Sequence, residues 1–445
     1  MSDNKLRVAI IGAGIGGLVF ALSLHKSNED IIVDIYESNT KLTEHGAGIG
    51  MWPRPWTILD DLGLAEDLQA ISVSQADFTF RKCDQAEGID FPSPIGKYGP
   101  VQTFHRAEFQ TVLSKHLPLS YNVHFSKRLV SYTGSDSGDI VLSFQDGSLA
   151  ICDVVVGCDG VRSAVRGTLY RSLAEKAEHN GDHAKAVEAL SHVDATYSGT
   201  SAYRSLIPTN LLVHKHPGHG AVTGPLWSFG KDKHVVVFPI SQGTMINVVV
   251  FISERELEGT VYNDPWVVPT ATEEIIRKFA FWNSEVRSLL ECSKNASLWA
   301  INTVVGLPTF VGERVALLGD AAHAMTPHQG SGAGQAFEDG YILASLLGHP
   351  SVTRATVHRA LQAYDAIRRP FAQEVQRRSR STGMLCDLSG PEFEGLTEEQ
   401  STSGTAVSSE ELVDISKAVD RMMDWMNVGS VMEDRNRALQ LLVCT

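Results

Sequence analysis

The sequence predicts a mixed α/β (α+β) fold, in which a Rossmann-like dinucleotide-binding domain is interleaved with a mostly antiparallel β-sheet domain and followed by C-terminal helices. Three observations support this prediction. An apolar run, Leu6 to Ile11, leads into a glycine-rich turn and a helix-like segment, which is the order of a Rossmann unit. Apolar segments of strand character recur between Thr196 and Thr303. The 445 residues are also enough for about three units of ~150 residues.

The first glycine-rich turn, Gly12-Ala13-Gly14-Ile15-Gly16-Gly17, has the spacing of a dinucleotide fingerprint. The amides at the start of the helix-like segment Leu18 to His25 can bind a pyrophosphate. A second apolar run, Ile31 to Tyr36, ends at Glu37, whose carboxylate can accept a hydrogen bond from a ribose hydroxyl. Because a carboxylate repels a 2′-phosphate, the predicted nucleotide is FAD or NAD rather than NADP. The predicted cofactor contacts here are Gly12, Gly14, Ile15, Gly17 and Glu37.

A second glycine-rich segment follows the short apolar strand Arg314 to Leu318. Asp320 lies just beyond this strand, at the edge where open α/β sheets bind ligands. The glycines permit close approach to a ring, and the helix expected to begin near Ala333 points its positive N-terminal end at that ring. The predicted cofactor contacts in this segment are Asp320, Pro327, Gly330, Gly332 and Ala333.

Strand segments outside these motifs predict a second sheet that roofs the cofactor. The segment Ala76 to Phe80 alternates polar and apolar residues, and further strands are expected at Ser201 to Ile207, His234 to Ile240 and Ile246 to Ile252. The predicted dinucleotide-binding domain comprises residues 1–75, 105–190 and 304–380. Residues 76–104 and 191–303 form the predicted substrate domain, and 381–445 a C-terminal helical segment.

Between the two glycine-rich motifs lies a third run, Asp153 to Ser163, which contains Cys158-Asp159-Gly160. The three motifs resemble, in the same order, those of the group A (single-component) FAD-dependent aromatic monooxygenases, and Gly319 to Gly340 resembles the salicylate hydroxylase branch. The similarity extends from about Leu6 to Arg380. It implies a tightly bound FAD, NADH or NADPH as a transient reductant, and O2 and a small aromatic molecule as substrates. It also implies cofactor contacts from Gly48, Arg106, Val130 and Asp159.

The catalytic candidates come mainly from the roof strands. In this family one strand often reads H-x-x-x-Y-P, and here His234 is kept while Phe238 replaces the tyrosine. Because side chains alternate along a strand, both should share one face, where the imidazole can remove or relay a phenolic proton. A structural histidine, satisfied by hydrogen bonds at the strand entry, is the alternative.

Four more residues complete the catalytic candidates. The segment containing Tyr203 and Arg204 resembles the family's YRG-x-x-P strand, and adjacent residues face opposite sides, so only one of the two can face the flavin pocket. Arg204 can hold a carboxylate bidentately, and Tyr203 can hydrogen-bond a hydroxyl. His45 and His323 flank loops that are expected to contact the flavin.

These features imply a monooxygenase that uses NAD(P)H and O2 to hydroxylate a phenolic or benzoate-type ring of the salicylate or 4-hydroxybenzoate type, through an oxygen adduct at flavin C4a. Attack at a carbon that bears a carboxylate releases CO2. Two alternatives remain: an oxidase or reductase of the same fold that does not hydroxylate a ring, and an NAD-dependent Rossmann dehydrogenase.

Composition argues against several other classes. A net charge of −14 disfavours nucleic-acid binding. The six cysteines form no C-x-x-C pair, which indicates reduced thiols in a cytoplasmic protein. His214, His216 and His219 lack neighbouring cysteine or carboxylate ligands, so no metal site is predicted. No apolar stretch reaches the ~18 residues of a membrane span, and the first strand starts too early for a signal peptide. We expect a monomer or homodimer.

Overall fold

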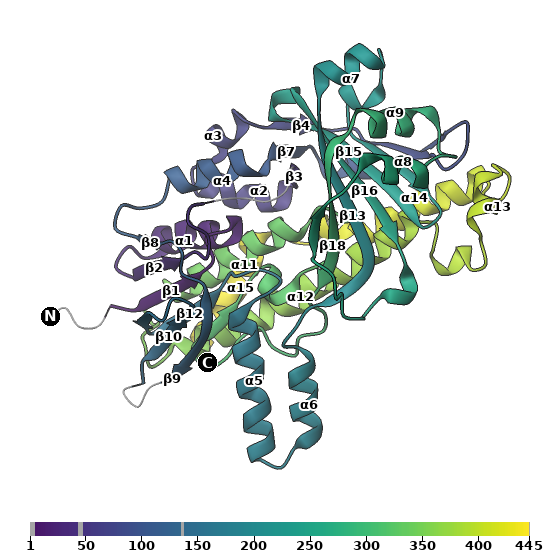
Figure 1. The fold of residues 1–445 in the computed structure, drawn as a ribbon. Helices are drawn as coiled ribbons and strands as arrows, with labels where there is room; N and C mark the ends of the chain where they lie inside the picture. Colours follow the sequence, from purple (N-terminus) through teal and green to yellow (C-terminus); the bar gives the residue numbers. More distant parts are fainter. Residues whose placement is uncertain (1–4, 43–47, 135–137, 445) are drawn as a thin grey trace.

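The computed structural model describes residues 5–42, 48–134 and 138–444 (Figure 1). This part of the chain forms two large sheets and two three-stranded sheets, with helices packed against them. The architecture is the mixed α/β fold that the sequence predicts.

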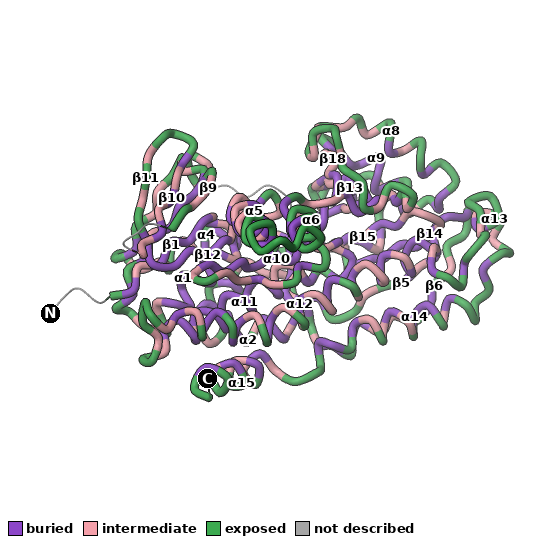
Figure 2. The backbone as a smooth tube through the Cα atoms, turned by 90° about the horizontal axis from the view of Figure 1, so that it is seen from below, coloured by how far each residue is buried: buried purple, intermediate pink, exposed green. Residues whose placement is uncertain are grey.

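Five parallel strands form the first large sheet. In spatial order they are β19 (Val315–Leu317), β12 (Val154–Gly157), β1 (Arg7–Ile11), β2 (Ile32–Tyr36) and β8 (Asn122–His124). The central strands read as continuous apolar runs because the sheet is covered on both faces, and all of β12 is buried (Figure 2). Helices α1 (Ile15–Ser27) and α11 (Gly332–Leu347) pack against each other beside this sheet.

Eight strands form the second large sheet. Their order is β17 (Val267–Pro269), β18 (Lys294–Thr303), β13 (Thr196–Pro208), β16 (Met245–Ser253), β15 (Lys233–Ile240), β14 (Leu226–Gly230), β5 (Thr79–Lys82) and β6 (Ile89–Phe91). Neighbouring strands are antiparallel except β14 and β5, so the prediction of a mostly antiparallel sheet is confirmed. All eight strands fall within residues 76–104 and 191–303, whereas the domain boundaries themselves stay a prediction.

Two smaller antiparallel sheets complete the β-structure. One contains β11 (Leu149–Cys152), β10 (Ile140–Phe144) and β9 (Leu129–Gly134), and the other β3 (Gly48–Met51), β7 (Val101–His105) and β4 (Val73–Gln75). The second small sheet touches the eight-stranded sheet, because Thr103 Oγ1 donates to the carbonyl of Pro239 at 2.7 Å. The amide of Gly48 also donates to Asn247 Oδ1 at 3.0 Å. These contacts close one side of the space between the large sheets.

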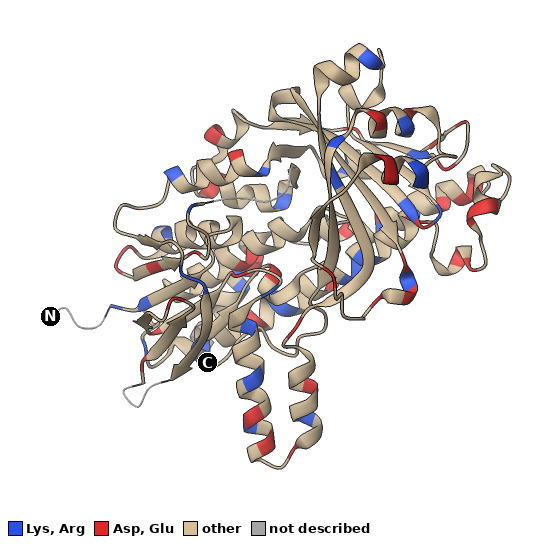
Figure 3. Cartoon of the chain, in the orientation of Figure 1, with Lys and Arg blue, Asp and Glu red and all other residues tan. Residues whose placement is uncertain are grey.

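The remaining helices cover the sheets and extend the chain beyond them. They are α2 (Pro53–Asp61), α3 (Ala65–Gln69), α4 (Arg106–Lys115), α5 (Ala164–His179), α6 (His183–Ser191), α7 (Thr209–Lys215), α8 (Thr272–Lys278), α9 (Ser284–Cys292), α10 (Asp320–His323), α12 (Val357–Cys386), α13 (Glu398–Thr402), α14 (Ser409–Met423) and α15 (Val431–Cys444). Helices α5 and α6 form a hairpin that projects from the body and carries charges of both signs (Figure 3). Helix α12 contacts both α14 and α15, which anchors the C-terminal helices to the core.

Two further findings concern the described residues as a whole. None of their helices is both long enough and apolar enough to cross a bilayer. They also contain no group of three or more His, Cys, Asp or Glu residues arranged to hold a metal ion.

Candidate active site

A cavity of about 740 Å³ is lined by residues from both large sheets. Most of the predicted cofactor residues lie on its wall. The predicted residues that line it are Gly12, Gly14, Ile15, Gly17, Glu37, Gly48, Arg106, Asp159, Arg204, Phe238, Asp320, Pro327, Gly330, Gly332 and Ala333. The fold therefore brings motifs that are far apart in the sequence to one cavity.

The turn between β1 and α1 forms one part of this wall. Gly12 has a φ of +104°, and a Cβ at this position would lie 2.4 Å from the carbonyl oxygen of Cys158, so only glycine fits. Helix α1 begins at Ile15 with Gly14 as its N-cap, and no side chain caps its first amides. These amides are free to bind phosphate oxygens, so the turn suits the pyrophosphate of FAD.

Glu37 follows β2 and lies beside the same turn. Its side-chain Oε2 accepts a hydrogen bond from the amide of Ala13 at 3.0 Å, and Oε1 accepts from the amide of Asn39 at 2.8 Å. These bonds fix the carboxylate at the cavity wall, and its remaining lone pairs can accept from ribose hydroxyls. The position suits the predicted ribose contact.

Glu37→Ala is expected to weaken FAD binding without abolishing it. One charge-assisted hydrogen bond contributes about 1.5–3 kcal/mol, which corresponds to a Kd roughly 10- to 150-fold higher. Titration of the apoprotein with FAD, followed by flavin fluorescence, measures this Kd. Glu37→Asp is the matched control, because it keeps the charge and both acceptor oxygens on a shorter side chain. An unchanged Kd in Glu37→Ala would contradict the ribose contact.

The second glycine-rich motif forms another part of the wall. Asp320 is exposed to the cavity, and within the described part of the chain its carboxylate accepts no hydrogen bond. The preceding amide, of Gly319, donates to Asp339 Oδ2 at 3.0 Å and so fixes the turn that carries Asp320. Helix α11 begins at Gly332, one residue before the expected start. The Asp320 carboxylate, which is held at the cavity by this turn, is therefore suited to accept hydrogen bonds from ribitol hydroxyls.

His323, a catalytic candidate beside the second glycine-rich loop, does not line the cavity. Its side chain is fully buried, and its Nε2 lies 2.6 Å from Asp339 Oδ2. Burial by itself raises the pKa of Asp339, but His323 and Arg368 outweigh burial and hold this pKa below its usual value. His323 therefore supports the Gly319 turn from behind, because it positions the carboxylate that the turn amide binds.

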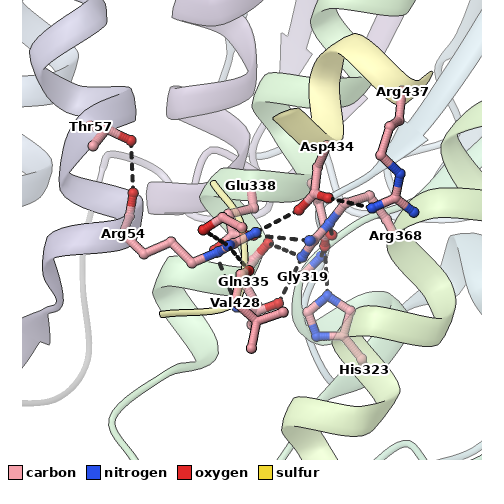
Figure 4. Close-up of polar contacts among 12 residues, drawn as sticks. Arg54, Thr57, Gly319, His323, Gln335, Glu338, Arg368, Val428, Asp434 and Arg437 are labelled. Atoms are coloured by element: carbon pink, nitrogen blue, oxygen red, sulfur yellow. Dashed lines mark hydrogen bonds and ion pairs between the residues drawn. The ribbon is translucent and has the colours of Figure 1, made fainter. Parts of the chain in front are cut away.

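A buried ionic cluster extends this support to four helices (Figure 4). Arg368 of α12 binds Glu338 at 2.9 Å and Asp339 at 2.8 Å, both on α11. Arg54 of α2 binds the same Glu338 at 3.0 Å and Asp434 of α15 at 2.5 Å. This cluster was not predicted, although two adjacent acidic residues within the apolar stretch of α11 are its signal in the sequence. Through Asp339, which binds the amide of Gly319, the cluster connects α15 to the turn that carries Asp320.

The eight-stranded sheet forms the roof of the cavity. Trp227, Val236, Val249 and Arg204 are paired in register across four neighbouring strands, and all four line the cavity. Side chains alternate along β13, so Tyr203 faces the other side, where it is buried in a separate apolar cluster. Of the Tyr203–Arg204 pair, only Arg204 reaches the cavity.

Arg204 supplies a positive charge inside this cavity. Its guanidinium lies 4.8 Å from the centre of the Trp299 ring. Burial, and then the neighbouring Arg106, lower the pKa of Arg204 to about 10, so it remains charged at neutral pH. In a protein with a net charge of −14, such a partly buried cation on the cavity wall is suited to holding an anionic ligand.

Several buried nitrogen atoms on the cavity wall have no hydrogen-bond partner among the described residues. They are Arg204 Nε, Trp227 Nε1, Asn247 Nδ2 and His328 Nε2. A buried polar group without a partner costs about 1–3 kcal/mol, so a ligand with oxygen acceptors or donors is expected to satisfy them.

The rest of the lining near the roof is aromatic or apolar. It includes Trp52, Phe78, Trp227, Val236, Phe238, Val249, Phe251 and Met325. Phe238 thus lies where the sequence places it, on the cavity side of β15. Flat apolar walls with a few convergent polar atoms suit a planar aromatic molecule. The cavity therefore fits FAD at the glycine-rich motifs and an aromatic ring beneath the roof.

His234 faces the predicted side of β15 but does not line the cavity. Its Nδ1 lies 2.6 Å from Asp387 Oδ1, and its Nε2 lies 3.2 Å from Nδ1 of His328. His328 lines the cavity in its place. Burial, followed by the proximity of His234, holds the pKa of His328 well below its usual value. His328 directly follows Pro327 in the second glycine-rich motif, and no role was predicted for it.

Of the predicted residues not yet discussed, Val130 lies outside the site. Val130 is 56% exposed and does not line the cavity, because alternation along β9 turns the neighbouring Leu129 inward instead. His45 lies outside the described residues.

Comparisons with known proteins agree with this geometry. A family model described as FAD binding domain matches residues 5–379. The FAD-dependent monooxygenase str9 of Strobilurus tenacellus is 35% identical, over 87% of this chain and 90% of the relative. A salicylate hydroxylase of Pseudomonas putida is 34% identical, over 88% of this chain and 89% of the relative.

A solved salicylate hydroxylase substrate complex has a TM-score of 0.79 and 32% identity, and 98% of each chain is covered. These matches confirm the resemblance to the salicylate hydroxylase branch and the prediction of FAD as cofactor. The chain therefore belongs to the FAD binding domain family, among the FAD-dependent monooxygenases.

Proposed function

We propose that this enzyme uses NADH or NADPH and O2 to hydroxylate a phenolic or benzoate-type aromatic ring. The observation that supports the proposal most directly is one cavity that joins a dinucleotide cradle to an aromatic-walled end. At that end lies the imidazole of His328, whose Nε2 has no hydrogen-bond partner among the described residues. A Rossmann dehydrogenase needs no second motif such as Gly319-Asp320 and no roof of this kind.

The glycine-rich motifs would hold FAD, with phosphates at the Gly12–Gly17 turn and sugar hydroxyls at Glu37 and Asp320. When bound, FAD accepts a hydride from the nicotinamide and transfers one oxygen atom of O2 to the ring. The protein's own contribution is to position the ring and exclude water from the reaction.

Substrate binding is assigned to the residues beneath the roof. Aromatic side chains such as Trp227 and Phe238 would hold the ring, and Arg204 would attract a carboxylate or another anionic group. Asn247 Nδ2 and Trp227 Nε1, which have no hydrogen-bond partner within the described ranges, would bind the remaining oxygen atoms of the substrate.

His328 is proposed as the residue that accepts the phenolic proton. Its Nε2 is buried at the cavity wall, and the lowered pKa keeps the imidazole neutral and ready to accept a proton at neutral pH. Loss of this proton makes the ring electron-rich and favours electrophilic oxygen transfer. Where the attacked carbon bears a carboxylate, CO2 leaves.

The proposed reaction is tested by substrate-stimulated NAD(P)H oxidation across substituted benzoates and phenols. Oxidation should be slow without an aromatic compound and faster with a substrate, and one atom of labelled O2 should appear in the product. CO2 release from a 2-hydroxybenzoate would identify attack at the carboxylated carbon. Stoichiometric H2O2 with every aromatic tested would instead favour an oxidase or reductase of the same fold.

Three predictions from the sequence stay proposals. The first two are a cytoplasmic location and a monomeric or homodimeric state. The third is the division into a cofactor-binding domain, residues 1–75, 105–190 and 304–380, and a substrate domain, residues 76–104 and 191–303.

A further inference from the structure

A second pocket lies behind the roof of the active-site cavity. It opens between the 3₁₀ helix η4 (Arg255–Leu257) and the residues that follow α12. Residues that line it include Asp232, Ser253, Arg255, Met384, Ser389 and Phe393. None of these residues lines the first cavity, so the two spaces are separate.

A row of buried polar side chains connects the two spaces. From the first cavity, His328 Nδ1 lies 3.2 Å from His234 Nε2, and His234 Nδ1 lies 2.6 Å from Asp387 Oδ1. At the far end, Asp387 Oδ2 accepts from Ser253 Oγ and from the Arg255 guanidinium, both at 2.6 Å. Asp387 and His234 are 0% and 2% exposed, so solvent reaches the row only at its two ends.

The protons of the two histidines can point the same way. If the Nδ1 atoms of His328 and His234 carry the protons, each imidazole donates toward the second pocket, and His328 Nε2 keeps a free lone pair at the active-site cavity. This arrangement leaves His328 Nε2 as the one acceptor of the two imidazoles that has no partner among the described residues.

The titratable groups that face one another here come from four elements. They are His328 from the loop before α11, His234 from β15, Arg255 from η4, and Cys386 and Asp387 from the end of α12. Burial would raise the pKa of Asp387, but the nearby His234 and Arg255 outweigh burial and keep it lowered. Burial raises the pKa of the Cys386 thiol well above its usual value, so Cys386 stays protonated and outside the exchange.

We propose that His328, His234 and Asp387 conduct the phenolic proton from the substrate cavity to the second pocket. The proposal rests on the proposed function, because the substrate phenol is the source of the proton. Ser253 and Arg255 bind Asp387 and line the second pocket, so they mark the exit to solvent.

The transfer balances as a set of linked proton movements. The phenol O–H bond breaks and its proton goes to His328 Nε2, while the Nδ1 proton of His328 passes to His234 Nε2. The Nδ1 proton of His234 passes to Asp387. A proton leaves Asp387 through Ser253, which accepts it on Oγ and gives its own hydroxyl proton to water in the second pocket. The net result is a phenolate in the cavity and one proton in solvent. The reverse transfer, when the product phenol regains its proton, restores the starting tautomers.

Asp387→Asn tests the relay in the FAD-loaded, oxidised enzyme without NAD(P)H, so that no turnover occurs. The probe is 2-hydroxy-5-nitrobenzoate, whose phenolate absorbs visible light. Stopped-flow mixing measures phenolate formation as a function of pH. We expect Asp387→Asn to form bound phenolate roughly 10²-fold more slowly than the wild type, with FAD content and probe Kd unchanged. Asp387→Glu should recover part of the rate.

The matched control is Asp232→Asn. Asp232 also lines the second pocket, but its carboxylate binds Lys231 and lies outside the row, so its rate should equal that of the wild type. Gly383→Ala gives an independent test, because a Cβ there would lie 2.3 Å from His328 Cδ2 and so displaces the imidazole. This variant should show the same slow phenolate formation.

Equal rates and pH profiles in Asp387→Asn and the wild type would overturn the relay. A slow rate that Asp387→Glu does not restore, accompanied by equal losses of FAD affinity and thermal stability, would overturn it as well and make Asp387 purely structural. Failure of the proposed function looks different: the wild type itself would neither ionise the probe in the cavity nor hydroxylate any phenol.

Discussion

Gly14→Val and Asp320→Ala are each expected to give a folded protein that purifies without FAD. Gly14 has φ −66° and ψ 172°, which any residue adopts, so valine fits the backbone but fills the wall where the pyrophosphate is expected. Asp320→Ala removes a carboxylate that forms no hydrogen bond within the described part of the chain. Flavin absorbance per polypeptide measures the loss, and thermal unfolding verifies the fold.

Gly134→Val is the control for the first variant, because a Cβ at Gly134 meets no atom within 4 Å. It should retain FAD at the level of the unmodified protein. Stoichiometric FAD in both Gly14→Val and Asp320→Ala would show that the two motifs do not hold the cofactor together.

His328→Ala is expected to retain FAD and lose hydroxylated product. Assistance by a positioned acid or base is typically worth about 10²- to 10⁴-fold, and the loss should fall on product formation because His328 faces the aromatic part of the cavity. NAD(P)H oxidation should continue in part, with H2O2 replacing the product. Simultaneous assays of product, H2O2 and NAD(P)H give the coupling. Parallel losses of FAD affinity and thermal stability would assign His328 a packing role.

The pH dependence gives a second measure of the same residue. The defect of His328→Ala should lessen as pH rises toward the pKa of the substrate phenol, because the phenolate then forms unaided. In the wild type, burial lowers the pKa of His328, so the imidazole can accept a proton at pH values below its ordinary pKa of about 6.5. Activity that depends on this step is lost only as pH falls through the lowered pKa.

Local sequence patterns predicted the dinucleotide end of the site well. The order of strand, glycine turn, helix and acid placed Gly14 and Glu37 on the cavity wall, because each follows from backbone geometry within one βαβ unit. Asp320 was found in the same way, since residues just beyond a parallel strand lie at the ligand-binding edge. These signals are local, so one sequence was sufficient.

The residues at the aromatic end of the cavity were harder to predict. Strand periodicity gives the face on which a side chain lies, but not whether that side chain reaches the cavity. Alternation gave the correct face for His234 and Phe238, yet only Phe238 lines the cavity. The loop before α11 places His328 over His234, and the end of α12 supplies Asp387 behind it. The hydrogen bond between His234 and Asp387 joins residues 153 positions apart in the chain. No pattern within β15 predicts such a partner.

The ionic cluster beneath the Gly319 turn has a consequence for how the enzyme is made. Arg54 reaches Asp434 and the carbonyl of Val428, and the ribosome synthesises both of these long after β1 and its glycine turn. Until α15 has left the ribosome and packed against the rest of the protein, Arg54 lacks its ion pair with Asp434. The ionic cluster that supports the Gly319 turn is then incomplete. The nascent chain contains the Gly12–Gly17 turn early in synthesis. The ionic cluster that supports the Gly319 turn is complete only after residue 434 has been synthesised.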